Sequence, residues 1–436
     1  MAGVRTGRAD LPLHGGHCPP WLFARMRALA AAIAEVVVAE FGPPEFLRRL
    51  SDPIWFQAFG AVLGFDWHSS GLTTVVCGAL KEGTADRQAD LGLFFAGGKG
   101  PASRRTPAEI AAVGERHGLA AGLAELERAS RLAAKVDSAA VQDGFGLYHH
   151  FFAFDRSGRW AVVQQGLRPD AALARRYHWL GEAVADFTRE PHAGVAGPAA
   201  TGPVLNMVAH DSAGARAASL DLTRQPVAEV LRDLAHLRQL EARAARMAEA
   251  AASGGRGPLP LSLFGGTAPL APGADTLVLG RPHPIPNAGR IDAVLARLYE
   301  RRPEEYADLL LTPGVGPATV RALAMVAEVA YGAPPARSDP VRYAFAHGGK
   351  DGHPFPVRRA DYDRTVGRVS NFGDNRLTVL GRVGIRQRQR RQGPGGRVRL
   401  ATVPGGREAR ERTPAGRQEP GRGAGAARSR GGGPAA

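Results

Sequence analysis

The chain has 436 residues, of which 44% are hydrophobic and 22% charged. This composition is ordinary for a globular protein, and the length fits about two or three domains. The only cysteines are Cys18 and Cys77, which excludes a disulfide framework and favours a reducing, cytoplasmic setting. The first residues lack the apolar core of a signal peptide, and no early apolar run is long enough to cross a bilayer, so we expect no membrane association.

The net charge of +15 is concentrated at the C-terminal end of the chain. Residues 367–436 contain 16 arginines against four acidic residues, so they carry +12 of that total. Gly, Arg, Gln and Pro dominate this segment, which predicts a disordered basic tail, with a frameshifted reading of GC-rich DNA as the alternative. The rest of the chain is close to neutral, so its charge alone does not predict nucleic-acid binding.

Apolar residues recur at three- and four-residue spacing along much of the N-terminal part, which indicates helices. The predicted helices cover residues 19–41, 45–50, 53–63, 72–80 and 119–135, with a further one opened by Thr106. A strand is predicted over residues 90–95. Two long β-hairpins follow, which pair 146–155 with 160–165 and 204–210 with 215–221, with 177–187 packed between them.

These elements predict an α/β (α+β) domain over residues 10–250, in which helices face a mostly antiparallel sheet. Residues 251–289 are rich in Gly, Pro, Ala and Ser and are interpreted as a linker. Residues 290–366 predict an all-α C-terminal domain that precedes the basic tail. The chain is therefore expected to consist of a mixed domain, a linker, a helical domain and a tail.

The helical domain contains a pattern typical of a helix–hairpin–helix. Leu309, Leu310 and Leu311 end one short helix, a glycine-punctuated turn follows, and Pro317 begins a second helix. Glycines let the main chain approach another molecule closely, and amide groups at a helix N-terminus favour an anion. The residues expected to contact DNA are Gly314, Val315, Gly316, Ala318, Thr319 and, further on, Lys350. The alternative is a helical hairpin used only for packing or for a protein partner.

Polar side chains gather around the first predicted β-hairpin. The candidates for a catalytic site are Asp137, Asp143, His149, Gln164, Gln165 and Lys99. Neighbouring residues of a strand face opposite sides, so one histidine and one glutamine would join the loop carboxylates on the exposed face of the sheet. Carboxylate and amide oxygens suit Mg²⁺ or Mn²⁺, which makes Asp137 and Asp143 the predicted metal ligands. The alternative is a hydrogen-bond network that only supports the sheet.

Several stretches of the chain carry a family resemblance. They include LPLHGGHCPPWL, GGKGPASRRTP, VDSAAVQDGFGLYHHFFAFD and SDPVRYAFAHGGKDGHPFPV. These motifs resemble the domain-of-unknown-function family numbered 763, which occurs in archaea and thermophilic bacteria, over about residues 10–366. The resemblance implies a shared fold and a link to DNA through the C-terminal hairpin, and it implies no particular reaction.

The C-terminal hairpin also resembles that of DNA glycosylases, which place a catalytic aspartate at a fixed distance beyond it. Here that position falls on Ala336, and the nearest acid is Asp339, which we expect to be a turn residue or helix cap. The expected function is DNA binding in repair or recombination, with metal-dependent DNA cleavage as the candidate activity. A base-excision glycosylase and a non-enzymatic adaptor that recognises DNA structure are the alternatives.

Overall fold

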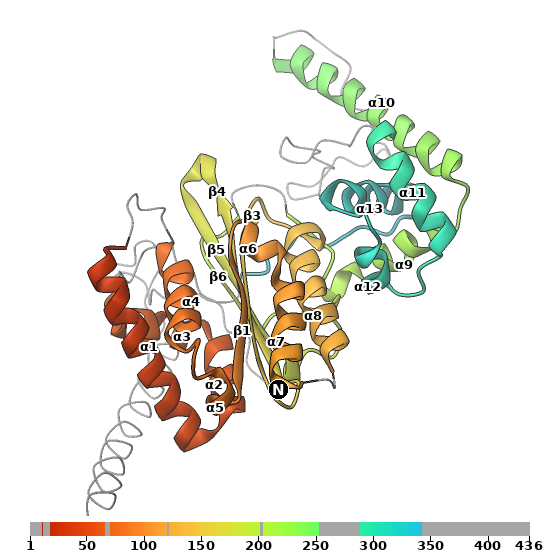
Figure 1. The fold of residues 1–436 in the computed structure, drawn as a ribbon. Helices are drawn as coiled ribbons and strands as arrows, with labels where there is room; N and C mark the ends of the chain where they lie inside the picture. Colours follow the sequence, from red (N-terminus) through yellow and green to blue (C-terminus); the bar gives the residue numbers. More distant parts are fainter. Residues whose placement is uncertain are drawn as a thin grey trace, which may run out of the picture. The chain divides into compact units, whose positions relative to one another are not determined.

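The computed structural model describes residues 11, 18–65, 70–119, 122–200, 204–252 and 288–341 (Figure 1). Within these ranges the protein is a mixed α/β structure with antiparallel sheets, as the sequence predicts. The predicted linker lies almost entirely outside the described residues, and Lys350 and the basic tail lie wholly outside them. In the described ranges, no helix has both the length and the apolar character needed to span a membrane.

The N-terminal helices follow the predicted pattern closely. They are α1 (Pro20–Phe41), α2 (Pro43–Ser51), α3 (Pro53–Val62), α4 (Gly71–Gly83) and the short α5 (Gln88–Leu91). Asp52 fixes the start of α3, because its side chain accepts hydrogen bonds from the backbone amides of Ile54 at 2.8 Å and Trp55 at 3.3 Å. Pro53 follows at the first helical position, where no amide hydrogen is needed.

The main sheet has five antiparallel strands in the order β1-β3-β4-β5-β6. They are β1 (Leu93–Lys99), β3 (Gly146–Asp155), β4 (Trp160–Arg168), β5 (Leu173–Leu180) and β6 (Gly194–Ala196). The first predicted hairpin is confirmed as β3 and β4, and the strand predicted over 90–95 begins later, at Leu93. The segment predicted to pack between two hairpins begins inside the sheet instead, because Tyr177 to Leu180 belong to β5.

The second predicted hairpin is wrong. Only β7 (Leu205–Asn206) is extended there, and it pairs with β2 (Val141–Gln142) in a separate two-stranded sheet. The other half of the predicted hairpin forms helix α9 (Ala213–Leu222). That segment contains four alanines, which have the highest helix propensity, and this outweighs its strand-like alternation of apolar and polar residues.

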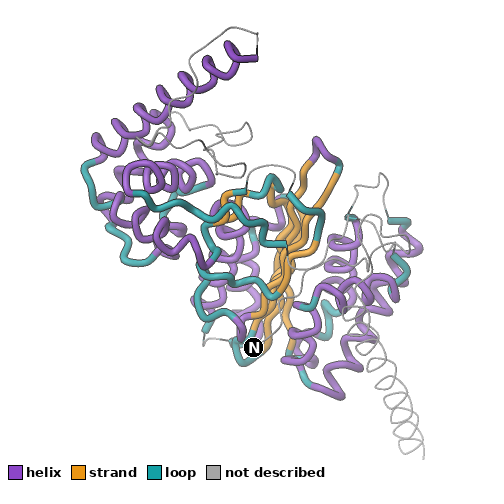
Figure 2. The backbone as a smooth tube through the Cα atoms, turned by 180° about the vertical axis from the view of Figure 1, so that it is seen from behind, coloured by secondary structure: helices purple, strands orange, loops and turns teal. Residues whose placement is uncertain are grey.

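Both faces of the main sheet are covered by helices, as Figure 2 shows for the backbone. On one face Phe95 and Phe151 pack with the core of α1–α5. On the other face Phe94 and Phe152 pack with α7 (Thr106–His117) and α8 (Leu123–Lys135). The exposed sheet face expected from the sequence therefore does not exist, and the strand residues of β3 from His149 to Asp155 are all buried.

Helices from the C-terminal part extend the second of these cores. They are α9, α10 (Val227–Ala252), α11 (Ala288–Arg301), α12 (Tyr306–Leu311) and α13 (Pro317–Tyr331). Leu222, Leu234, Leu298, Leu309 and Leu323 are buried in the same hydrophobic cluster as the sheet residues Phe94 and Phe152. A single apolar core thus runs from the sheet to the two helices that flank the glycine-rich turn.

Candidate functional site

Two rows of polar side chains cross the main sheet at neighbouring positions. The row facing α8 consists of His150, Gln164 and Tyr177, and the row facing α4 consists of His149, Gln165 and Arg176. Adjacent strand residues point to opposite faces, which explains why the His–His, Gln–Gln and Arg–Tyr pairs each contribute one side chain to each row. We call these the α8-side row and the α4-side row.

The α8-side row leads to the buried carboxylate of Asp137. Asp137 lies in a π-helical turn, η1 (Val136–Ala140), that continues α8, and such turns occur frequently at functional sites. Gln164 Nε2 donates to Asp137 Oδ2 at 2.5 Å, and Trp179 Nε1 donates to the same oxygen at 2.9 Å. His192 Nε2 lies 2.5 Å from Asp137 Oδ1. Burial raises the pKa of Asp137, and the neighbouring His192 opposes that rise.

His150 continues this network away from Asp137. Its Nδ1 lies 2.7 Å from Gln164 Oε1, and its Nε2 lies 2.9 Å from the Ser130 hydroxyl oxygen. Because an amide oxygen only accepts, Nδ1 carries the proton and the neutral ring accepts from Ser130 through Nε2. Burial lowers the pKa of His150 to about 4, which keeps the ring neutral at pH 7. The chain Ser130–His150–Gln164–Asp137 is therefore fully hydrogen-bonded.

Asp143 forms a second buried carboxylate centre with Arg175 and Tyr177. Arg175 Nη1 donates to Asp143 Oδ2 at 2.7 Å, and the Tyr177 hydroxyl donates to the same oxygen at 2.8 Å. The backbone amide of Phe145 donates to Oδ1 at 3.1 Å, and the Phe145 ring lies 4.6 Å from the guanidinium of Arg175. Burial alone would lower the pKa of Arg175, but the nearby Asp143, Tyr177 and Asp339 outweigh it and hold that pKa above its ordinary value.

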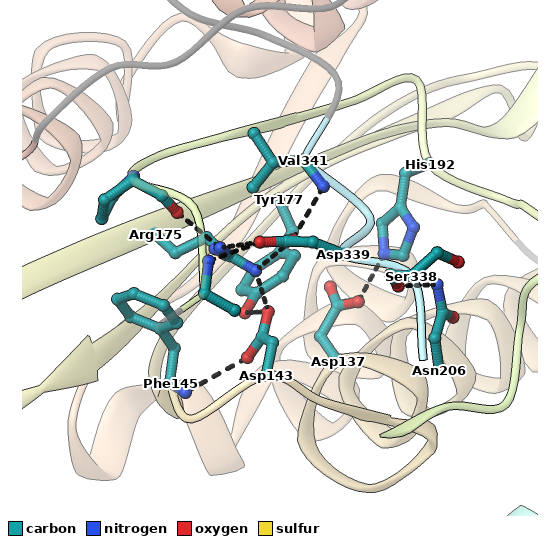
Figure 3. Close-up of polar contacts among 12 residues, drawn as sticks. Asp137, Asp143, Phe145, Arg175, Tyr177, His192, Asn206, Ser338, Asp339 and Val341 are labelled. Carbon is teal, nitrogen blue, oxygen red and sulfur yellow. Dashed lines mark hydrogen bonds and ion pairs between the residues drawn. The ribbon is translucent and has the colours of Figure 1, made fainter. Parts of the chain in front are cut away.

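Asp339 brings a second carboxylate to the same guanidinium (Figure 3). Arg175 Nη1 donates to Asp339 Oδ1 at 2.8 Å and Nη2 donates to Oδ2 at 3.0 Å, a two-pronged contact. The backbone amide of Ala200 also donates to Oδ2, at 2.5 Å. The expected turn role of Asp339 is confirmed, because its Oδ1 accepts from the amide of Val341 at 3.0 Å. The sequence did not predict its contact with Arg175.

A strap formed by residues 332–341 carries Asp339 from the end of α13 to the sheet. Asn206 holds it at two points, by donating from its backbone amide to Ala336 O at 3.0 Å and from Nδ2 to Ser338 O at 3.1 Å. The amide of Ala336 donates to the Ser212 hydroxyl at 2.8 Å. The strap therefore connects the helix that begins at the glycine-rich turn with the Arg175 centre.

In the α4-side row, Gln165 and Arg176 form hydrogen bonds with uncharged groups. Gln165 Nε2 donates to Ser70 O at 2.9 Å and to the Tyr148 hydroxyl at 2.7 Å, and its Oε1 accepts from the Thr73 hydroxyl. The Thr73 hydroxyl in turn accepts from Arg176 Nε at 2.9 Å. Burial lowers the pKa of Arg176 to about 10.

His149 stands apart within this row. Its side chain is 1% exposed, and in the described part of the chain neither ring nitrogen has a hydrogen-bond partner. Burial, reinforced by His150, Lys99 and Arg176, lowers the pKa of His149 to about 3. Lys99 pairs with His149 in register at the edge strand β1, where its own side chain is exposed.

The structure brings together only part of the predicted catalytic set. Gln164 reaches Asp137, whereas His149, Gln165 and Lys99 belong to the α4 side of the sheet, away from both predicted carboxylates. The expected grouping of His149 with the carboxylates is therefore wrong. The physical reason is strand alternation, because His150, not His149, shares a face with Gln164.

The predicted metal ligands fit a metal ion poorly as they stand. Each oxygen of Asp137 and Asp143 already contacts a protein nitrogen or hydroxyl group. A Mg²⁺ or Mn²⁺ ion would have to displace these donors to gain its oxygen ligands. In the ranges that the structure describes, no group of three or more His, Cys, Asp and Glu side chains is placed to hold a metal. The metal stays a prediction.

Sequence reasoning missed Arg175, Tyr177 and His192. The first two lie in the run ARRYHW, where charged residues interrupt a strand whose neighbours are apolar. A charged residue inside a strand of a sheet covered on both faces has to find a buried partner, and this signal was available. His192 follows β5 in a loop, and no local pattern distinguishes it.

The glycine-rich turn is the second candidate site. We define the hairpin turn as residues 312–319, between the end of α12 and the first turn of α13. Pro313, Gly314 and Pro317 are exposed, whereas Val315 is 1% exposed and anchors the turn in the core, so its side chain is not available for the predicted DNA contact. Gly314 has φ +91°, a backbone conformation that other residues rarely adopt. No side chain caps the N-terminus of α13 at Gly316.

Three basic side chains from different helices surround this turn. Arg297 Nη1 donates to Pro313 O at 2.5 Å, and Lys135 Nζ donates to Val315 O. Arg321, on the first turns of α13, donates through Nε to Gln142 Oε1 at 3.0 Å, and Gln142 Nε2 donates to Pro317 O at 2.9 Å. The amide groups that open α13 therefore lie in a positively charged setting, which favours an anion.

The fold and these two sites define a mixed α/β protein with a helix-covered antiparallel sheet, a buried ionic centre and an exposed glycine turn at a helix N-terminus. The chain belongs to the family described as "Protein of unknown function (DUF763)", whose model matches residues 7–357. The family resemblance of the sequence motifs is thus confirmed. No curated protein and no solved structure matches the chain.

Proposed function

We propose that this protein binds DNA through the sugar–phosphate backbone, and that the hairpin turn is the contact. The observation that carries the proposal is the uncapped N-terminus of α13, which begins at the exposed Pro317 and follows a turn that Lys135, Arg297 and Arg321 surround. The layout of α12, turn and α13 supports a helix–hairpin–helix element. Contacts to phosphates carry no base information, so binding should tolerate changes of DNA sequence.

The test compares two glycine substitutions in the full chain by fluorescence anisotropy with labelled duplex DNA. Gly314→Ala strains the backbone at φ +91° and places a Cβ 2.7 Å from Arg297 Nη1 and 3.0 Å from Val294 Cγ2, so Arg297, Val294 or the turn itself has to shift. Gly332→Ala is the matched control, because Gly332 also has positive φ, at +60°, but nothing lies within 4 Å of its added Cβ. We expect Gly314→Ala to weaken binding at least about tenfold relative to the control. A tenfold change corresponds to the loss of roughly one hydrogen bond to a charged phosphate. Equal affinities of the two variants would contradict the proposal.

DNA cleavage is a second candidate function, favoured by the contact between Asp137 and His192. A buried carboxylate that holds an imidazole orients it as a general base, the arrangement used by many hydrolases. Incubation of the protein with plasmid DNA, with and without Mn²⁺, tests this candidate. Cleavage that is lost in His192→Ala supports it, and cleavage that is unchanged in this variant excludes the role of His192. The glycosylase alternative gains no support, because Asp339, the acid nearest to the expected catalytic position, binds Arg175 through both of its oxygens.

A further inference from the structure

We propose that Arg175 and the backbone amide of Ala200 form a binding site for a phosphate group, and that Asp339 occupies this site when no phosphate is bound. The ligand class is a tetrahedral oxyanion, either free phosphate or a phosphate of a nucleic-acid strand. The site is separate from the hairpin turn, so its existence does not depend on the proposed DNA contact there.

The first argument is the fixed geometry of the donors. The side chain of Arg175 is fully buried, stacks on Phe145 and donates through Nη2 to Pro198 O at 2.5 Å. Its two terminal nitrogens and the Ala200 amide all point at the carboxylate of Asp339. A planar guanidinium fork joined by a backbone amide is the donor set that proteins use for carboxylate and phosphate oxygens.

The second argument is charge. Arg175 already has a buried counter-ion in Asp143, whose side chain is fully buried and which Tyr177 and Phe145 also hold. Asp339 is therefore a second carboxylate on one guanidinium. Asp137 is a further buried acid nearby, and the charge of Asp143 helps to raise the pKa of Asp137. Asp143 alone balances the charge of Arg175, so Asp339 is an additional anion on this guanidinium.

The third argument is access. The side chain of Asp339 is 23% exposed, whereas those of Arg175 and Asp143 are 0% exposed. Of the two carboxylates on Arg175, only Asp339 reaches solvent and comes from the strap, while Asp143 is enclosed by the body of the protein. Asp339 is thus the group that an external oxyanion can replace. Release of Asp339 would also loosen the end of the strap that leads from α13.

The experiment measures binding of inorganic phosphate to full-chain variants by isothermal titration calorimetry. A tethered carboxylate competes at high effective concentration, so the unaltered protein should bind phosphate weakly, and Asp339→Ala should bind it at least about tenfold more tightly. Asp308→Ala is the matched control, because it removes an exposed aspartate that pairs with Arg128 at the surface. If Asp339→Ala binds phosphate no better than this control, the proposal is overturned.

Two further measurements locate the phosphate. In the Asp339→Ala background, the paired change Arg175→Gln and Asp143→Asn removes the guanidinium together with its buried counter-charge and should abolish binding. The amide resonance of Ala200 should shift on addition of phosphate to Asp339→Ala, a readout that needs no buried substitution. Binding without Arg175, or binding that leaves the Ala200 resonance unmoved, would overturn the site.

The source of the phosphate follows from competition in the Asp339→Ala variant. Displacement of inorganic phosphate by a 5′-phosphorylated dinucleotide, but not by its unphosphorylated counterpart, assigns the site to a nucleic-acid end. Displacement by both assigns it to an internal phosphodiester, and displacement by neither assigns it to a free small-molecule phosphate. Adding Gly314→Ala should leave this binding unchanged, which separates failure of this proposal from failure of the proposed DNA contact.

Discussion

The two faces of the main sheet differ in how they surround a buried histidine. His149 and His150 are neighbours on β3, and both are buried. His150 has a hydrogen-bond partner at each ring nitrogen, in a network that ends at the carboxylate of Asp137. For His149, the described residues provide no partner at either nitrogen. Two adjacent histidines therefore differ: the ring nitrogens of His150 are both hydrogen-bonded, and those of His149 are not.

This difference shows that hydrogen bonding stabilises the α8-side row at a position where the α4-side row lacks it. Unsatisfied buried polar groups are rare, because each costs the desolvation energy of the group without a compensating hydrogen bond. The α8-side row meets this requirement through Asp137, whereas the α4-side row leaves His149 beside the cationic Lys99 and Arg176.

Loss of the Asp137 carboxylate should have the largest effect. Asp137→Ala leaves Trp179 Nε1, Gln164 Nε2 and His192 without their shared acceptor inside the core. We expect the free energy of unfolding to fall by about 3–5 kcal/mol, as for removal of one partner from a buried polar network. Urea denaturation measures this change. Asp308→Ala is the surface control and should cost less than about 1 kcal/mol. Similar losses for both variants would contradict a structural role of the Asp137 network.

Replacement of each histidine by phenylalanine tests the comparison directly. His150→Phe leaves the Ser130 hydroxyl and Gln164 Oε1 unpaired and should cost about 2 kcal/mol. His149→Phe removes a buried polar group that has no partner and should leave stability unchanged or raise it by about 1 kcal/mol. The same denaturation experiment measures both. A greater loss for His149→Phe than for His150→Phe would show that His149 has a partner after all.

Acid should destabilise the protein through these histidines. Burial lowers the pKa of His149 to about 3 and of His150 to about 4, below the value of about 6.5 for an unfolded histidine. The unfolded chain then binds more protons below about pH 6.5, so the free energy of unfolding falls as the pH drops towards 4. Each histidine contributes at most about 1.4 kcal/mol per pH unit. Burial also lowers the pKa of His178, which adds to the effect, whereas the raised pKa of Asp137 opposes it.

The contribution of His149 can be isolated by comparing unfolding between pH 7 and pH 5 in two proteins. His149→Phe should show a shallower pH dependence than the unaltered chain, because one titrating group is gone. Equal slopes would mean that His149 does not have the lowered pKa. Besides burial, the charges of His150, Lys99 and Arg176 contribute to the pKa of His149, and all of them lower it.

The smallest effect is expected for Lys99→Ala. Lys99 is exposed at the sheet edge, so its removal should leave stability nearly unchanged. Its positive charge is one cause of the lowered pKa of His149, so that pKa should rise slightly in the variant. An NMR titration of the His149 ring measures the shift. A pKa that falls, or a large loss of stability, would contradict the placement of Lys99 beside His149.

The sequence predicted the local elements well and the long-range contacts poorly. The α1–α4 helices and the β3–β4 hairpin follow from apolar spacing and turn residues, which are local properties. Strand alternation separated His149 from His150 and Gln164 from Gln165, but it could not say which row would meet Asp137. That choice depends on the helices that cover each face, and these contacts are set by the packing of the whole fold.

Local pattern marks Arg175 as a charged residue inside a strand, but it identifies none of the partners that form the Arg175 centre. Arg175 and Asp339 are 164 residues apart, and only the path of the strap brings them together. Asp143 was identified as a functional candidate because it is an acid in a polar loop, yet its partners Arg175 and Tyr177 come from a strand whose pairing was not foreseen. The Ala-rich segment of α9 differs from its prediction for the opposite reason, because local helix propensity outweighs the strand-like alternation there.

DNA binding by the hairpin turn is the central claim, and anisotropy of a labelled duplex with Gly314→Ala and Gly332→Ala tests it most directly. The basic tail is present in both proteins, so any nonspecific affinity that it adds is the same in each. The account predicts binding at least about tenfold weaker for Gly314→Ala, with no dependence on the DNA sequence. Indistinguishable affinities, measured with both variants folded, would contradict it.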